Sequence, residues 1–226
     1  YTSHSGLIAG LGNEISGPYA SVLGGAENVA SAEGTMISGG TNNTASGSYA
    51  AVSGGDGHTA SGDYSSIAGG YGGTASGMYS AISSGDSNTA SGEYSAVTAG
   101  ISNISSATGS VVSGGRSNEA AANYSVITAG SSNSISGTYG VISGGTENTV
   151  SGYYGMIAGG RGHLASGEYC AISGGYTSVA SGEYSVVSGG QENTTSGMYS
   201  VVSGGRDNTA SGLRAVVSGG YLNEAA

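Results

Sequence analysis

Lysine, phenylalanine and tryptophan are absent from this chain of 226 residues, and proline and cysteine occur once each. The single cysteine, Cys170, excludes a disulfide within the chain. Charged residues make up only 8% of the sequence, against roughly 25% in an ordinary globular domain. Large apolar side chains are also scarce, so a domain with one thick hydrophobic core is excluded. Only a regular packing of small residues can fold this composition.

Cations are the scarcest charged groups. Four arginines (Arg116, Arg161, Arg206 and Arg214) stand against fourteen acidic residues, and the net charge is −10. This balance excludes the electrostatic surface that binds nucleic acid or anionic lipid. No apolar run approaches the ~18 residues of a membrane span, so no membrane insertion is predicted. The sequence begins with Tyr1 and has no signal peptide, so we expect a processed chain or a piece of a longer one.

Glycine, in contrast, is abundant and strictly periodic. It recurs with a constant period of 15 from Gly10 to Gly220, at fifteen positions and without an insertion. Segments such as 37–51 and 187–201 follow one consensus, Ile/Val-Ser-Gly-Gly-x-x-Asn-Thr-Ala-Ser-Gly-x-Tyr-Ser-Val/Ala. The first column is always aliphatic, the seventh is Asn in eleven of fifteen repeats, and the thirteenth is Tyr in eleven of fourteen. Most charges lie in columns five, six and twelve, which we interpret as exposed turns.

The period predicts the fold. Two to four glycines per repeat would each cost a helix roughly 1 kcal/mol, whereas short alternating segments between glycine-rich corners are typical of strands. The sequence therefore predicts an all-β, parallel β-solenoid (β-roll) of about fifteen coils of 15 residues, with two short strands per coil. We expect one solenoid over residues 1–226, uncapped at both ends.

The columns also predict the interior. The aliphatic and alanine columns should meet across a thin core, and the asparagine column should form a ladder of amides that bond the next coil. The Gly-Gly corner should make a tight turn with positive φ. Cys170 replaces a serine in an inward column and is interpreted as a buried structural thiol.

Repeats such as YSVVSGGQENTTSG (184–197) and YSVVSGGRDNTASG (199–212) resemble the head repeats of trimeric autotransporter adhesins. The resemblance covers residues 7–226 and implies a parallel β-roll that packs side by side with two others into a bacterial surface adhesin. This chain departs from the family in its period of 15, its paired glycines and its tyrosine column, and it shows no neck, stalk or membrane anchor. Some phage fibre repeats look similar.

A second resemblance is to grass antifreeze proteins, which are small β-rolls that bind ice. It rests on DNTASG (207–212), ENTVSG (147–152) and SNSISG (132–137). The matching candidate for an ice or ligand face is an outward array of hydroxyls and methyls, against the alternative of an ordinary solvated sheet face. Its residues are Thr44, Ser46, Thr59, Ser61, Thr74, Ser76, Thr89, Ser91, Thr149, Ser151, Thr194, Ser196, Thr209 and Ser211.

The other candidate is an apolar and aromatic stripe that becomes more apolar toward the C-terminus. A soluble monomer seldom exposes such a stripe, so we interpret it as a self-association surface, with an adhesive ligand surface and tyrosines packed along the corners of a monomer as alternatives. Its residues are Tyr139, Tyr154, Tyr169, Tyr184, Tyr199, Val126, Val141, Val186, Val201 and Val216.

Catalysis is not predicted. His58 and His163 occupy one column seven coils apart and cannot share a metal, and Cys170 has no partner. Glu168 and Glu183 are neighbours in adjacent coils, a spacing that could suit glycoside chemistry, but solvated corner acids are the simpler interpretation.

We therefore expect a non-enzymatic extracellular or cell-surface fibre segment, without cofactor or metal. It should be a homo-oligomer, either a trimer or an end-to-end filament, and it could present a repetitive surface to a host surface or matrix ligand. An ice-binding β-roll is the alternative.

Overall fold

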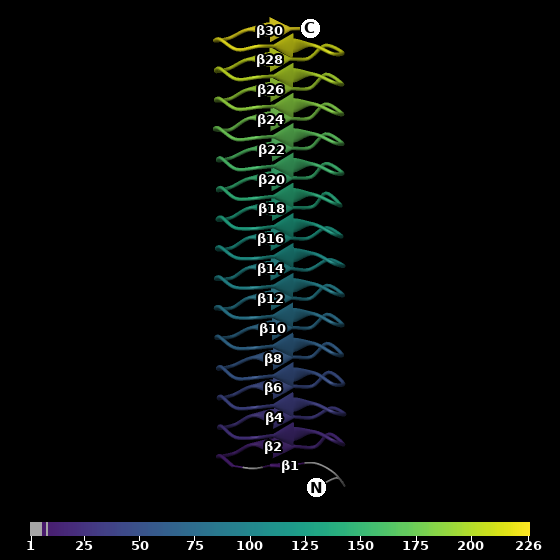
Figure 1. Cartoon of the computed structure of the whole chain (residues 1–226), viewed down its shortest axis with the longest axis vertical. Coiled ribbons are helices and arrows are strands. Elements are labelled where there is room, and N and C mark those ends of the chain that lie inside the picture. The colour runs from purple at the N-terminus through teal and green to yellow at the C-terminus, as the bar shows by residue number, and fades with distance from the viewer. Residues whose placement is uncertain (1–5, 8) are drawn as a thin grey trace. The chain divides into compact units, whose positions relative to one another are not determined.

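The computed structural model describes residues 6, 7 and 9–226, so residues 1–5 and 8 of the predicted solenoid lie outside the described residues. The chain divides into two compact units, residues 1–115 and 116–226, which are considered separately. In each unit the coils follow one another with two short parallel strands per coil (Figure 1). Among the described residues there is no helix, so none has the length and hydropathy of a membrane span.

The first unit contains one sheet of odd-numbered and one sheet of even-numbered strands. The odd sheet consists of β1 (Gly6–Leu7), β3 (Ser21–Val22), β5 (Met36–Ile37), β7 (Ala51–Val52), β9 (Ser66–Ile67), β11 (Ala81–Ile82), β13 (Ala96–Val97) and β15 (Val111–Val112). The even sheet consists of β2 (Glu14–Ile15), β4 (Val29–Ala30), β6 (Thr44–Ala45), β8 (Thr59–Ala60), β10 (Thr74–Ala75), β12 (Thr89–Ala90) and β14 (Ile104–Ser105).

The second unit repeats this arrangement. Its even sheet consists of β16 (Glu119–Ala120), β18 (Ser134–Ile135), β20 (Thr149–Val150), β22 (Leu164–Ala165), β24 (Val179–Ala180), β26 (Thr194–Thr195), β28 (Thr209–Ala210) and β30 (Glu224–Ala225). Its odd sheet consists of β17 (Val126–Ile127), β19 (Val141–Ile142), β21 (Met156–Ile157), β23 (Ala171–Ile172), β25 (Val186–Val187), β27 (Val201–Val202) and β29 (Val216–Val217).

Within each unit the strands pair in parallel, and every strand residue faces its equivalent in the next coil. Thr74 pairs with Thr89 in the first unit, and Val186 pairs with Val201 in the second. Such two-residue strands hold together because each hydrogen-bonds to the coil before it and the coil after it, so no coil is stable alone. The predicted parallel β-solenoid with two short strands per coil is confirmed.

The interior is as thin as the sequence indicates. The first-column aliphatic side chains from Val22 to Val217 are at most 6% exposed, and most alanines of the even sheets are fully buried. Near the end of the second unit, Val202 and Val217 pack with Ala210 of the opposite sheet. Small side chains on the even sheet let the two sheets approach closely, which compensates for the scarcity of large apolar residues.

The corners explain the strict glycine column. Gly145 has a φ of 92°, and a Cβ at this position would collide with the carbonyl oxygen of Gly160 in the next coil. Only glycine satisfies both constraints, which confirms the predicted turn with positive φ. The tyrosine column lies in the opposite corner, in a turn between the two strands rather than within either strand.

Candidate functional site

The asparagine column forms the predicted amide ladder inside each unit. Asn28 is representative: its Nδ2 donates to the carbonyl oxygens of Gly24 (3.2 Å) and Gly40 (3.0 Å), and its Oδ1 accepts from the backbone N–H of Asn43 (3.0 Å). Nearly every member of this column that is flanked by full coils is buried. These amides satisfy backbone groups of the turn, so the column stabilises the fold and presents nothing to a ligand.

Histidine substitutes for asparagine at two of these rungs. His58 Nδ1 accepts from the backbone N–H of Gly73 (2.9 Å), and His163 Nδ1 accepts from that of Ser178 (3.0 Å). Burial lowers the pKa of both imidazoles, which keeps them neutral and leaves Nδ1 as an acceptor. The rung after each histidine is small, Gly73 or Ser178, and a Cβ at Gly73 would lie 3.0 Å from His58 Nδ1. Sequence reasoning missed this pairing, although it is visible as His followed one repeat later by Gly or Ser.

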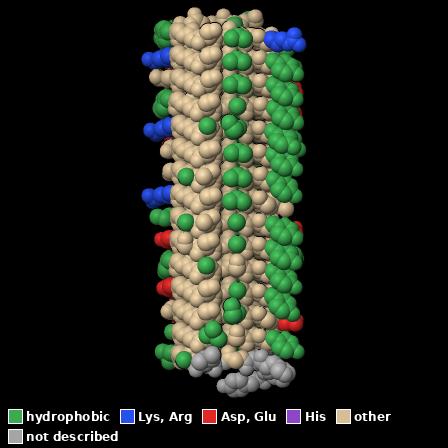
Figure 2. All heavy atoms as spheres, viewed as in Figure 1, with side chains coloured by type: hydrophobic (Ala, Val, Ile, Leu, Met, Phe, Trp, Pro, Cys, Tyr) green, Lys and Arg blue, Asp and Glu red, His purple; other side chains and the backbone are tan. Residues whose placement is uncertain are grey.

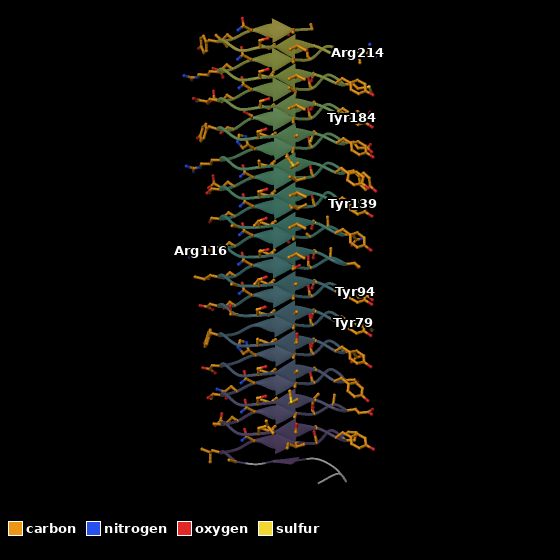
Figure 3. All side chains as sticks on the ribbon, in the orientation of Figure 1. Tyr79, Tyr94, Arg116, Tyr139, Tyr184 and Arg214 are labelled. Carbon is orange, nitrogen blue, oxygen red and sulfur yellow. The ribbon has the colours of Figure 1, made fainter. Side chains whose placement is uncertain are left out.

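The tyrosine column forms stacked ladders at one corner of each unit. Neighbouring rings are nearly parallel, at 2–11°, with centroids 4.7–5.3 Å apart. The rungs are Tyr49, Tyr64, Tyr79 and Tyr94 in the first unit and Tyr124, Tyr139, Tyr154, Tyr169, Tyr184 and Tyr199 in the second. In Figure 3, Tyr139 and Tyr184 project from one edge of the second unit and Arg116 from the other. Each ring is 37–58% exposed.

Every rung of these ladders has a backbone conformation that tyrosine rarely adopts. The φ values of the stacked tyrosines lie between 54° and 59°, in the left-handed region that costs a bulky residue roughly 1–2 kcal/mol. Gly34 and Gly109 occupy the same column and adopt the same φ without strain. Stacking contributes about 0.5–1.5 kcal/mol per pair, which only offsets the strain. Tyrosine in this column therefore contributes an exposed aromatic surface and little net free energy of folding.

The residues predicted to form one self-association stripe lie in two separate columns of the second unit. The tyrosines occupy the corner, whereas Val126, Val141, Val186 and Val201 point outward from the odd sheet and are half-buried by their neighbours. Val216 in β29 is the most exposed of the valines, at 58%. Figure 2 shows two green columns on this face, separated by backbone and by side chains that are neither hydrophobic nor charged. The stripe is thus an exposed aromatic ladder beside a flatter aliphatic one.

The predicted threonine and serine face is the outward side of the even sheets. All seven threonines are half-buried and all seven serines are exposed. In the first unit Thr44, Thr59, Thr74 and Thr89 are in direct register, so hydroxyls repeat at about 4.8 Å from coil to coil. In the second unit Leu164 and Val179 separate Thr149 from Thr194 and Thr209. Only the first unit has four uninterrupted rows.

The corner opposite the tyrosines carries a row of surface ion pairs in the second unit. Arg161 Nε lies 3.1 Å from Glu147 Oε2, and Arg206 Nε lies 3.2 Å from Asp207 Oδ2. The guanidinium of Arg206 also lies over the ring of Tyr221, 5.8 Å from its centroid. Such exposed pairs are worth about 0–1 kcal/mol each, so we interpret this corner as a solvated edge.

The groups considered for catalysis are a buried thiol and two carboxylates at a corner of the second unit. Cys170 is buried, as predicted, and burial raises the pKa of its thiol, which keeps it unreactive. Glu168 is exposed and Glu183 is half-buried in successive corners. Within the described part of the chain, no group of three or more His, Cys, Asp or Glu residues could hold a metal ion.

Comparison with protein-family models and with curated proteins gives no match. What the fold defines is a parallel β-solenoid with two regular outward faces and an aromatic corner.

Proposed function

We propose that this chain is a non-enzymatic, structural and adhesive segment of an extracellular or cell-surface fibre, and that three copies associate side by side. Side-by-side association would involve the odd sheet and tyrosine ladder of the second unit. A regular repeat of this kind can present the same groups many times to a host surface or matrix ligand. End-to-end stacking into a filament is the alternative assembly.

The observation that carries the proposal is the absence of charge on one face. None of the four arginines and fourteen acids occupies an outward position of the odd-numbered strands β17–β29; these positions hold valine, methionine and alanine, and serine, threonine and alanine follow each strand. Burying an unpaired charged side chain in an interface is costly, and this face has no charged side chain to bury. Small outward side chains also allow sheets to pack at about 10 Å, face to face.

The test is the mass in solution, measured by light scattering after size exclusion. We expect three times the monomer mass of 21.5 kDa. Val186→Glu with Val201→Glu should reduce the trimer to monomer, because it places charge on the odd sheet. Thr194→Glu is the matched control, since the equivalent column of the even sheet already holds Glu119 and Glu224. A monomeric wild-type chain, or large open assemblies, would overturn the trimer.

Ice binding is a second candidate, favoured by the four uninterrupted Thr-Ala-Ser rows between Thr44 and Ser91. Regularly spaced hydroxyls and methyls on a flat sheet can order water. Thermal hysteresis and inhibition of ice recrystallisation are the readouts. Thr74→Glu should abolish both, whereas Ala81→Glu, on the opposite sheet of the same unit, should leave them unchanged. Wild-type protein without either activity would exclude this function.

A further inference from the structure

The tyrosine ladder of the first unit has a geometry suited to covalent chemistry between its rungs. Rings of Tyr49, Tyr64, Tyr79 and Tyr94 stack with centroids 5.3, 5.0 and 5.0 Å apart and interplanar angles of 2–11°. Because the backbone repeats from each coil to the next, neighbouring rings stack in nearly the same orientation. The rings are also 44–58% exposed, so an oxidant in solution can reach them.

One end of this ladder has an acceptor for the phenolic proton. The hydroxyl of Tyr49 donates to Glu33 Oε1 at 3.0 Å, and this hydrogen bond is the main reason that the pKa of Tyr49 is raised. Loss of an electron makes a phenol strongly acidic, so its proton has to leave at once. Glu33 is positioned to take the proton as the Tyr49 radical forms.

We propose that the Tyr49–Tyr94 ladder is an oxidative cross-linking site, at which a peroxidase and hydrogen peroxide join tyrosines of adjacent coils as dityrosine. Each of two phenols loses one electron and one proton, and together these reduce one hydrogen peroxide to two waters. The two phenoxyl radicals then form one carbon–carbon bond between ring carbons ortho to the oxygens. The hydrogens on those two carbons move to the oxygens and restore both phenols.

The bond would join equivalent tyrosines of adjacent coils within one chain. Turning the stacked rings about their side-chain torsions would bring two ortho carbons together, because the ring centroids are only 5.0–5.3 Å apart. The result is a covalent connection between neighbouring coils along the exposed corner. This ladder lies outside the second-unit stripe of the proposed trimer, so the inference does not depend on that assembly.

The opposite corner supplies internal controls. Tyr71, Tyr176 and Tyr221 are 58%, 46% and 61% exposed, similar to the ladder rings. None of them has a tyrosine at the same position of an adjacent coil: Tyr71, for example, pairs with Asp56 and Asp86. Exposure alone would make these three tyrosines react as readily as the ladder, whereas stacking predicts that bonds within one chain form only between tyrosines stacked in adjacent coils.

The experiment treats a dilute solution of the chain of residues 1–226 with peroxidase and hydrogen peroxide, follows dityrosine fluorescence, and locates the bonds by mass spectrometry. We expect bonds 49–64, 64–79 and 79–94, with a yield per chain that is independent of protein concentration. Bonds at Tyr71, Tyr176 or Tyr221 in equal amount, or a yield that falls in proportion on dilution, would overturn the proposal.

Phenylalanine variants separate chemistry from folding. Tyr64→Phe with Tyr79→Phe keeps the stack but leaves no adjacent pair of phenols in this ladder, so all three bonds should disappear while circular dichroism is unchanged. Tyr71→Phe is the matched control and should leave them intact. Glu33→Gln should lower the 49–64 bond relative to 79–94. If the double variant keeps its bonds, or if Glu33→Gln leaves that ratio unchanged, the mechanism is wrong.

Discussion

Residue 73 is an inward position of the asparagine column that holds glycine, and the equivalent position of the preceding coil holds His58. Gly73 does not adopt a positive φ, so its backbone does not require glycine. A Cβ there would lie 3.0 Å from His58 Nδ1 and 3.5 Å from Ile82 Cδ1. We expect Gly73→Asn alone to destabilise the protein by about 1–3 kcal/mol, the cost of overpacking a filled interior.

The same substitution should have the opposite effect once the imidazole is gone. With His58→Asn, an asparagine at residue 73 has room to donate to two turn carbonyls and to accept from the N–H of Asn88, as Asn28 does with its own neighbours. Two or three hydrogen bonds at about 1 kcal/mol each, with about 0.4–1 kcal/mol from replacing glycine, give a stabilisation of about 2–4 kcal/mol. The coupling free energy between the two sites should lie at or above the upper end of the ~0.5–3 kcal/mol found for contacting residues.

A double-mutant cycle measures this coupling. Urea unfolding followed by far-ultraviolet circular dichroism gives the free energies for the wild type, both single variants and the double variant. Because repeat proteins need not unfold in one step, hydrogen exchange at the Asn88 amide provides a local readout, and its protection should rise only in the double variant. Equal effects of Gly73→Asn in the two backgrounds would refute the argument that His58 fills the next rung.

Three further predictions concern the two buried histidines, two buried serines and two glycines. Burial lowers the folded-state pKa of His58 and His163, so the free energy of unfolding should fall as pH decreases below about 6.5, the pKa of histidine in the unfolded chain. Replacing both histidines with asparagine should remove this loss of stability at low pH. An unchanged dependence of stability on pH would contradict the prediction. Ser80→Ala should be neutral or stabilising because the buried Ser80 hydroxyl has no hydrogen-bond partner among the described residues. Ser125→Ala should cost about 1 kcal/mol because Ser125 Oγ donates to the carbonyl oxygen of Ala122 at 2.6 Å, and equal urea midpoints for the two variants would contradict this. Gly77→Ala should lower the thermal midpoint sharply because its Cβ would collide with the Gly92 carbonyl, while Gly54→Ala, with nothing within 4 Å, should not.

The repeat made the fold predictable because it constrains every coil in the same way. The aliphatic column, the Asn28-type rungs and the Gly145-type corners each have one physical role, and that role was predicted from the spacing alone. The strained backbone of the tyrosines was not predicted, since the alternation of a segment such as Tyr-Ser-Val-Val-Ser (184–188) does not distinguish a strand residue from a turn residue with positive φ. Tyr184 and Val186 lie in two separate columns because the turn ends between them. A pattern of period two does not specify where a turn ends, so this separation was not predicted.

The direct register of the coils separates the repeat into inward and outward columns that are subject to different constraints. The inward columns are fixed by contacts between one coil and the next, and they tolerate few alternatives. The outward columns touch mainly their own equivalents in the adjacent coils, so a change at Thr74 or Ala81 alters one point of a lattice and leaves the interior as it was. A chain built in this way can gain or lose whole coils, or acquire a new surface one row at a time, while its cross-section stays constant. The number of coils and the outward side chains can therefore vary independently of each other.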